Sequence, residues 1–187
     1  MSTLKVENLT GITSGANANK IIVPAGQTLD VSAGAITPSA GQIIQRVHTT
    51  WNTETSNTSN SAWVDVADSN ISVTPKLATS RLFITAHYHF HSYGTSEYAG
   101  GMCRIVHDGT SLDSTTQFYE LYTQQTSGGV QANIHTRNSK CMTIASGNTN
   151  ARTIKLQIIK YGGAPTAAKI NQGAYYYSTI VVDEVVQ

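Results

Sequence analysis

The feature that most constrains the fold is a series of short segments rich in Val, Ile, Thr and Tyr, which begins at Gln42 and continues to the end of the chain. β-branched and aromatic residues favour strands, and turn-forming pairs such as Asp108-Gly109 and Gly147-Asn148 separate the segments. No window of about 11 residues carries the apolar stripe of a helix. We therefore predict strands at residues 42–51, 62–66, 69–73, 81–91, 101–107, 116–122, 130–136, 140–145, 153–161 and 175–186.

The number of these segments sets the fold class. Eight to ten strands in roughly 145 residues match the size of a jelly roll. We predict an all-β protein with a jelly-roll-like antiparallel β-sandwich over residues 45–187. Residues 1–44 break the pattern, because short β-prone pieces alternate with turn signals such as Pro24-Ala-Gly26 and apolar residues are too few for a core. This part is predicted to be an extended N-terminal arm that is ordered by its partners.

Charge and targeting signals narrow the function classes. With 12 Lys+Arg against 11 Asp+Glu, the net charge is +1, which does not favour a nucleic-acid partner. The N-terminus lacks the features of a signal peptide, and no apolar stretch reaches the roughly 20 residues of a membrane-spanning helix. We expect folding in the cytosol without membrane insertion, and we expect Cys103 and Cys141 to be reduced core residues.

Three local signatures carry a resemblance to a known class of protein. They are Lys5-Val-Glu-Asn-Leu-Thr-Gly-Ile-Thr-Ser-Gly15, the segment Ile71-Ser-Val-Thr-Pro-Lys-Leu-Ala-Thr-Ser-Arg-Leu-Phe-Ile84 that follows Trp63-Val-Asp65, and the closing Tyr177-Ser-Thr-Ile-Val-Val-Asp-Glu-Val-Val186. Together they resemble small structural proteins of tailed bacteriophages, of the fibre, spike or decoration type. The motifs are strand and turn idioms rather than chemical signatures, and they do not distinguish the head of a particle from its tail.

This resemblance implies a homotrimer located in the virion and assembled in the host cytoplasm. The arm, residues 1–44, would attach to other virion proteins, and the sandwich would face outward and contact the host surface, including its glycans. Because the arm can span at most roughly 150 Å, a short spike fits better than a long tail fibre. The alternative is a capsid decoration (cement) protein that stabilises the shell through its arm.

A row of histidines is the most unusual local motif. Because strand side chains alternate, His87, His89 and His91 should share the face opposite Leu82, Ile84, Ala86, Tyr88 and Phe90. Neutral imidazole binds iron, zinc and nickel, and a trimer would bring two such histidines from each chain to an octahedral site on its threefold axis. The alternatives are a polar face, solvated or at a subunit seam, and a pH-sensitive seam. His48, His107 and His135 receive no role.

Two groups of tyrosines are candidates for binding. Tyr93 and Tyr98 flank a Gly/Ser-rich segment after the histidine row, which we predict to be a loop whose tyrosines contact a glycan or receptor. Tyr175-Tyr-Tyr177 is predicted to open the last strand, with alternate rings filling the core and lining a sheet face.

No catalytic motif supports an enzyme. The chain has no Gly-x-Ser-x-Gly, phosphate-binding glycine loop or His-Glu-x-x-His. Asp108 with Asp113, or Glu97 with Asp108, could serve as glycosidase carboxylates if they met in a cleft, but the turn already accounts for Asp108. We expect no enzymatic activity and keep a glycan-degrading enzyme as the third alternative.

Overall fold

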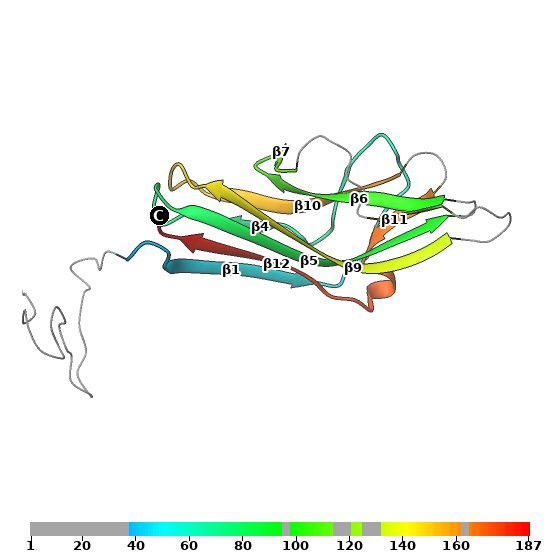
Figure 1. The fold of residues 1–187 in the computed structure, drawn as a ribbon, viewed down its shortest axis with the longest axis horizontal. Helices are drawn as coiled ribbons and strands as arrows, with labels where there is room; N and C mark the ends of the chain where they lie inside the picture. The colour runs from blue at the N-terminus through cyan, green and yellow to red at the C-terminus, as the bar shows by residue number, and fades with distance from the viewer. Residues whose placement is uncertain (1–37, 95–97, 114–120, 125–131, 162–164) are drawn as a thin grey trace, which may run out of the picture. The chain divides into compact units, whose positions relative to one another are not determined.

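Two antiparallel sheets packed against each other form the part of the chain that the structure describes (Figure 1). This structure is a computed structural model, and it describes residues 38–94, 98–113, 121–124, 132–161 and 165–187. The first sheet contains β1 (Ile43–Trp51), β2 (Thr55–Asn57), β5 (Arg81–Gly94), β9 (Ala132–Ala145), β11 (Pro165–Ile170) and β12 (Ser178–Val185). The second contains β3 (Val64–Asp65), β4 (Ile71–Val73), β6 (Tyr98–His107), β7 (Thr110–Ser111), β8 (Leu121–Gln124) and β10 (Arg152–Lys160).

Strand β5 is the centre of the first sheet. β9 pairs with it along its whole length, from Arg81 opposite Ala145 to Gly94 opposite Ala132. On its other side, β12 pairs with the first half of β5 and β11 with the second half. β1 continues the sheet beyond β12, and β2 continues it beyond β11.

The order of the strands identifies the sandwich. β10 pairs with β6 on one side and with β3 and β4 on the other, while β7 and β8 extend β6. The two orders β1-β12-β5-β9 and β4-β10-β6-β8 are those of an eight-stranded jelly roll, to which β2, β3, β7 and β11 are additions. The predicted all-β fold class, a jelly-roll-like antiparallel sandwich, is confirmed.

The core lies between the sheets and follows the two-residue period of the strands. On β5, Leu82, Ile84, Ala86, Tyr88 and Phe90 point inward and are at most 2% exposed. They pack in one cluster with residues of the second sheet and of β12, each large apolar side chain contributing about 1.5–3 kcal/mol on burial. Inward members from those strands include Ile105, Ile154, Leu156, Ile158, Ile180 and Val182.

Most strand predictions are confirmed, and the differences have physical reasons. The two strands predicted at 130–136 and 140–145 are one strand, β9, because β5 opposite is long enough to pair with all of it. β2, β7 and β11 were not predicted; two of them are at most three residues long and carry no period that a sequence pattern could show. The segment predicted at 116–122 lies largely outside the described residues.

The turn predicted at Asp108-Gly109 is confirmed, since both residues have positive φ, 47° and 82°. Neither cysteine forms a disulfide. Cys103 is buried as predicted, but Cys141 is exposed, because its position on β9 points away from the core. The prediction of a core role for Cys141 is therefore wrong.

The predicted arm, residues 1–44, falls largely outside the described residues and stays a prediction. Its last two residues, Ile43 and Ile44, belong to β1. Backbone hydrogen bonds from Gly41 to Val186 and from Val186 to Gln42 join this end of the sandwich to the C-terminal strand. In the part of the chain that the structure describes, no helix is long and apolar enough to cross a membrane.

Candidate functional site

The three histidines of β5 share the outer face of the first sheet, as the alternation of the strand predicted. They differ in exposure: His87 is exposed, whereas His89 and His91 are 4% and 2% exposed. Side chains on the outer face of a sheet are buried only where other residues pack over them. The burial of His89 and His91 therefore shows that other residues cover this part of the face.

Two aromatic rings cover the buried histidines. Tyr176 stacks on His89, with ring centroids 3.6 Å apart and planes 7° apart. His135, on the neighbouring strand β9, stands opposite His91 in the sheet register and stacks on it at 4.3 Å. His135 received no role from the sequence; that is corrected here, because it lies 4.3 to 5.3 Å from two members of the row.

Burial fixes the charge state of these rings. Burial, together with the nearby His135, His91 and Arg137, lowers the pKa of His89 to about 4. Burial also lowers the pKa of His91, against the opposing effect of its hydrogen bond to Asn133, where Nε2 and Oδ1 are 2.6 Å apart. The Nδ1 atoms of both rings have no hydrogen-bond partner among the described residues. Both rings are therefore neutral at neutral pH.

The segment that carries Tyr175, Tyr176 and Tyr177 is held at its base by a buried asparagine. Asn171 follows β11 directly, is fully buried and adopts the left-handed conformation (φ 54°). Its side chain donates to the Trp51 carbonyl at 3.1 Å and accepts from the Ser178 hydroxyl at 2.6 Å. Asn171 precedes the segment and Ser178, the first residue of β12, follows it, so their hydrogen bond joins the two ends of the segment.

A carboxylate fixes the middle of the segment, the short 3₁₀ turn η1 (Gln172–Ala174). Glu54 accepts from the Gly173 N–H at 2.6 Å and from Lys169 Nζ at 2.7 Å, and these bonds lower the pKa of Glu54. Gly173 has φ 67°, and a Cβ there would lie 2.9 Å from the Tyr175 ring. The turn thus requires glycine and holds Tyr175 close above it.

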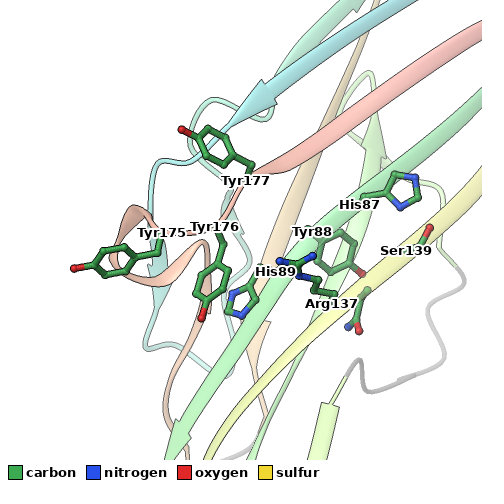
Figure 2. A pocket seen from close by; sticks show the side chains of 9 residues that line it. His87, Tyr88, His89, Arg137, Ser139, Tyr175, Tyr176 and Tyr177 are labelled. Carbon is green, nitrogen blue, oxygen red and sulfur yellow. The ribbon is translucent and has the colours of Figure 1, made fainter.

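The result is a groove of about 480 Å³ on the outer face, which we call the tyrosine groove. Figure 2 shows Tyr176 against His89, with Tyr175 and Tyr177 directed away from the sheet. Tyr175 is 85% and Tyr177 71% exposed, and all three lie before β12, so the prediction that alternate rings fill the core is wrong. The lining residues are His87, Tyr88, His89, Arg137, Asn138, Ser139, Tyr175, Tyr176 and Tyr177.

The chemistry of the groove suits the binding of a polar ligand. Tyrosine rings offer flat faces, and Arg137, Ser139 and the histidines offer hydrogen bonds. Among the described residues that line it, none is a carboxylate, cysteine or lysine. The sequence could not show that Arg137 lies beside Tyr175 and Tyr177, because the groove depends on the register of β9 against β5 and on the Asn171 turn.

The other predicted contacts lie elsewhere. Tyr93 and Tyr98 do not sit in a loop: β5 continues to Gly94, and β6 begins at Tyr98. Tyr93 is half-buried and is not among the residues that line the tyrosine groove. Their contact with a glycan or receptor stays a prediction, and the intervening residues 95–97 lie outside the described residues.

The predicted metal site depends on the histidine row of β5. Within one chain, the described residues contain no group of three His, Cys, Asp or Glu side chains placed to hold a metal ion. The predicted site of iron, zinc or nickel on a threefold axis would draw on His87, His89 and His91 of several chains, and it stays a prediction. Of the three, His87 alone is exposed in the single chain.

The candidate carboxylates have structural contacts. Asp108 accepts from the Thr153 N–H at 2.8 Å and pairs with Arg152 at 3.2 Å. Asp113 accepts from the Ile105 N–H at 2.9 Å and lies 3.4 Å from Lys140. Glu97 lies outside the described residues. Each of the two described carboxylates thus holds its own turn or strand end.

Comparison with known proteins gives matches to solved structures alone. No protein-family model and no curated protein matches the chain. The VP2 subviral particle of infectious bursal disease virus matches at 18% identity and a TM-score of 0.35, over 94% of this chain and 45% of that one. The Gx strain of the same virus matches at 15% and 0.37, over 91% and 44%. The chain spans less than half the length of these proteins, and similarity at this level carries no argument about function.

Proposed function

We propose that this chain is a structural protein of a virus particle, of the tailed-bacteriophage type that its sequence resembles, and that its jelly roll is displayed on the particle surface to contact the host. In this proposal the protein is a homotrimeric short spike. Residues 1–44 attach each chain to other virion proteins, and the chain has no catalytic role.

The observation that carries the proposal is the pair of exposed rings at the tyrosine groove. Tyr175 and Tyr177 are 85% and 71% exposed, yet hydrogen bonds at Asn171 and Glu54 hold their segment in place. A fold of this size could place these rings in its core, and large exposed aromatic side chains on a fixed support are typical of recognition surfaces. The groove therefore supports a contact surface rather than an inert face.

Three measurements test the proposal. Antibody labelling of intact particles should place the chain on the exterior, and sedimentation of the purified protein should give a trimer. Purified wild-type protein should adsorb to host cells, and Tyr175→Ala with Tyr177→Ala should lower adsorption at least tenfold. The matched control is Ile43→Ala, which removes a 49% exposed apolar side chain on β1, outside the groove. A chain absent from purified particles would overturn the proposal.

A capsid decoration protein is the second candidate, and β9 favours it. This strand of 14 residues is paired along one edge alone within the described residues, which leaves a long edge on which a coat subunit could add a strand. Electron microscopy of the particle separates the candidates. Density over the capsid, with loss of shell stability when the protein is removed, would favour decoration, and density on the tail would favour the spike.

A further inference from the structure

We propose that the tyrosine groove binds a carboxylated saccharide, held by ring stacking on its exposed tyrosines and by a carboxylate pair with Arg137. The inference deepens the proposed function. The choice of a sugar as ligand rests on the proposal that the chain acts at a host surface. The carboxylate is inferred from the groove alone.

The shape of the groove comes first. About 480 Å³ lies within the range of small-ligand pockets. Two of its walls are aromatic rings whose faces are not used by the core, since Tyr175 and Tyr177 are largely exposed. A pyranose ring presents C–H groups on one face and hydroxyls at its edge, and a tyrosine ring contacts the first while its hydroxyl reaches the second.

The charge of the groove selects the ligand further. Arg137 stands opposite His89 on β9 and is exposed. Within the described residues it forms no ion pair, and no carboxylate lines the groove. His89, the buried histidine of the lining, is neutral, so the guanidinium of Arg137 is the permanent positive charge of the groove. A guanidinium pairs with a carboxylate through two parallel hydrogen bonds.

A single cation also argues against more highly charged ligands. Nucleic acid requires several phosphate contacts, which one arginine in a chain of net charge +1 does not provide. Two further polar groups on the outer faces of β9 and β5, Ser139 and His87, lie along one side of the groove, where they can hydrogen-bond to sugar hydroxyls. The groove thus combines an aromatic platform, one guanidinium that can pair with an anion, and further hydrogen-bonding groups.

The probe is a tetrasaccharide of galacturonic acid, compared with its methyl ester. The ester keeps every ring and hydroxyl and removes the charge. Titration calorimetry with the full-length protein should show the acid binding at least tenfold more tightly than the ester, and the difference should shrink at high salt. Equal affinity for both would overturn the carboxylate pair.

Three variants separate the parts of the site. Arg137→Gln should lower affinity for the acid at least tenfold and leave the ester unchanged. Tyr177→Ala should weaken both. Arg81→Gln is the matched control, because Arg81 is also exposed and lies at the far end of β5, beside Thr143. Wild-type affinity for the acid in Arg137→Gln would overturn the inference.

Two further outcomes keep the inference and the proposed function apart. If the acid does not bind at millimolar concentration while the chain is found on the particle exterior and adsorbs to host cells, the ligand is wrong and the surface role stands. If the acid binds as expected but the chain is absent from particles, the site stands and the virion role fails. Tighter binding of a hexaglutamate peptide than of the saccharide would show an acidic peptide site and overturn the sugar.

Discussion

Tyr176 lies flat on His89, with 3.6 Å between ring centroids and 7° between ring planes. This stack joins the segment before β12 to the central strand of the first sheet, and it covers a histidine that would otherwise face solvent. A neutral imidazole stacks on a phenol ring without burying a charge, whereas a protonated one would have to be desolvated. The geometry of the tyrosine groove is therefore linked to the protonation of His89.

We expect the protein to lose stability as the pH falls from about 6.5 towards about 4. In the folded state the pKa of His89 is lowered to about 4, from 6.5, so in this interval the unfolded chain binds a proton that the folded chain does not. The contribution of neutral His89 to the free energy of unfolding is complete above pH 6.5 and is lost as the pH falls towards 4. The pKa of His91 is also lowered, so this residue adds to the loss of stability. Urea denaturation of wild type and His89→Gln at several pH values checks this. The variant should lose less stability over the interval, and parallel losses would contradict the prediction.

Removing the covering ring should restore ordinary titration to His89. In Tyr176→Ala the imidazole becomes accessible, so its pKa should rise from about 4 towards 6.5, because burial is the largest cause of the shift. NMR titration of the histidine ring protons measures this directly. Tyr175→Ala is the control: that ring is 85% exposed, and its loss should leave the pKa of His89 near 4. A pKa that stays low in Tyr176→Ala would show that His135 and Arg137, not burial, dominate.

The sequence predicted the fold better than it predicted the site. Alternation alone placed the three histidines of β5 on one face and the even-numbered residues between Leu82 and Phe90 on the other, because a strand period is a local property. The partners of the row could not be found in this way. His135 meets His91 through the register of two strands that are far apart in the sequence. Tyr176 stacks on His89 because the chain turns at Asn171, and the sequence pattern did not predict the left-handed conformation of that residue.

Glu184 should be among the most important polar residues for stability. Its side chain is fully buried on β12, where its carboxylate accepts from the backbone N–H groups of Lys76 and Leu77 at 2.8–2.9 Å and from the Ser80 hydroxyl at 2.6 Å. Glu184→Gln replaces one carboxylate oxygen with an NH2 group, which cannot accept the hydrogen bonds that this oxygen accepts. We therefore expect a loss of about 3 kcal/mol in the free energy of unfolding. Chemical denaturation measures it.

The neighbouring residue provides the control for Glu184. Asp183 points to the outer face and pairs with Arg46 at 2.6 Å, and the side chain of that arginine is 60% exposed. Because exposed ion pairs contribute little, Asp183→Asn should cost less than about 1 kcal/mol. Equal losses in the two variants would mean that burial of the carboxylate does not decide its contribution.

The contact between the two sheets at Gly101 should not tolerate a single added methyl group. A Cβ at Gly101, on β6, would lie 2.7 Å from the Phe90 ring, 2.8 Å from the Ile159 carbonyl oxygen and 2.9 Å from the Ala168 Cβ. Two of these neighbours belong to the opposite sheet, so the added group must push the sheets apart or displace the Phe90 ring. We expect Gly101→Ala to lower the free energy of unfolding by about 1–3 kcal/mol. Ala145→Val, which adds bulk at an exposed position of β9, should leave it unchanged within about 0.5 kcal/mol. Wild-type stability of Gly101→Ala would show that the sheets are not packed this closely.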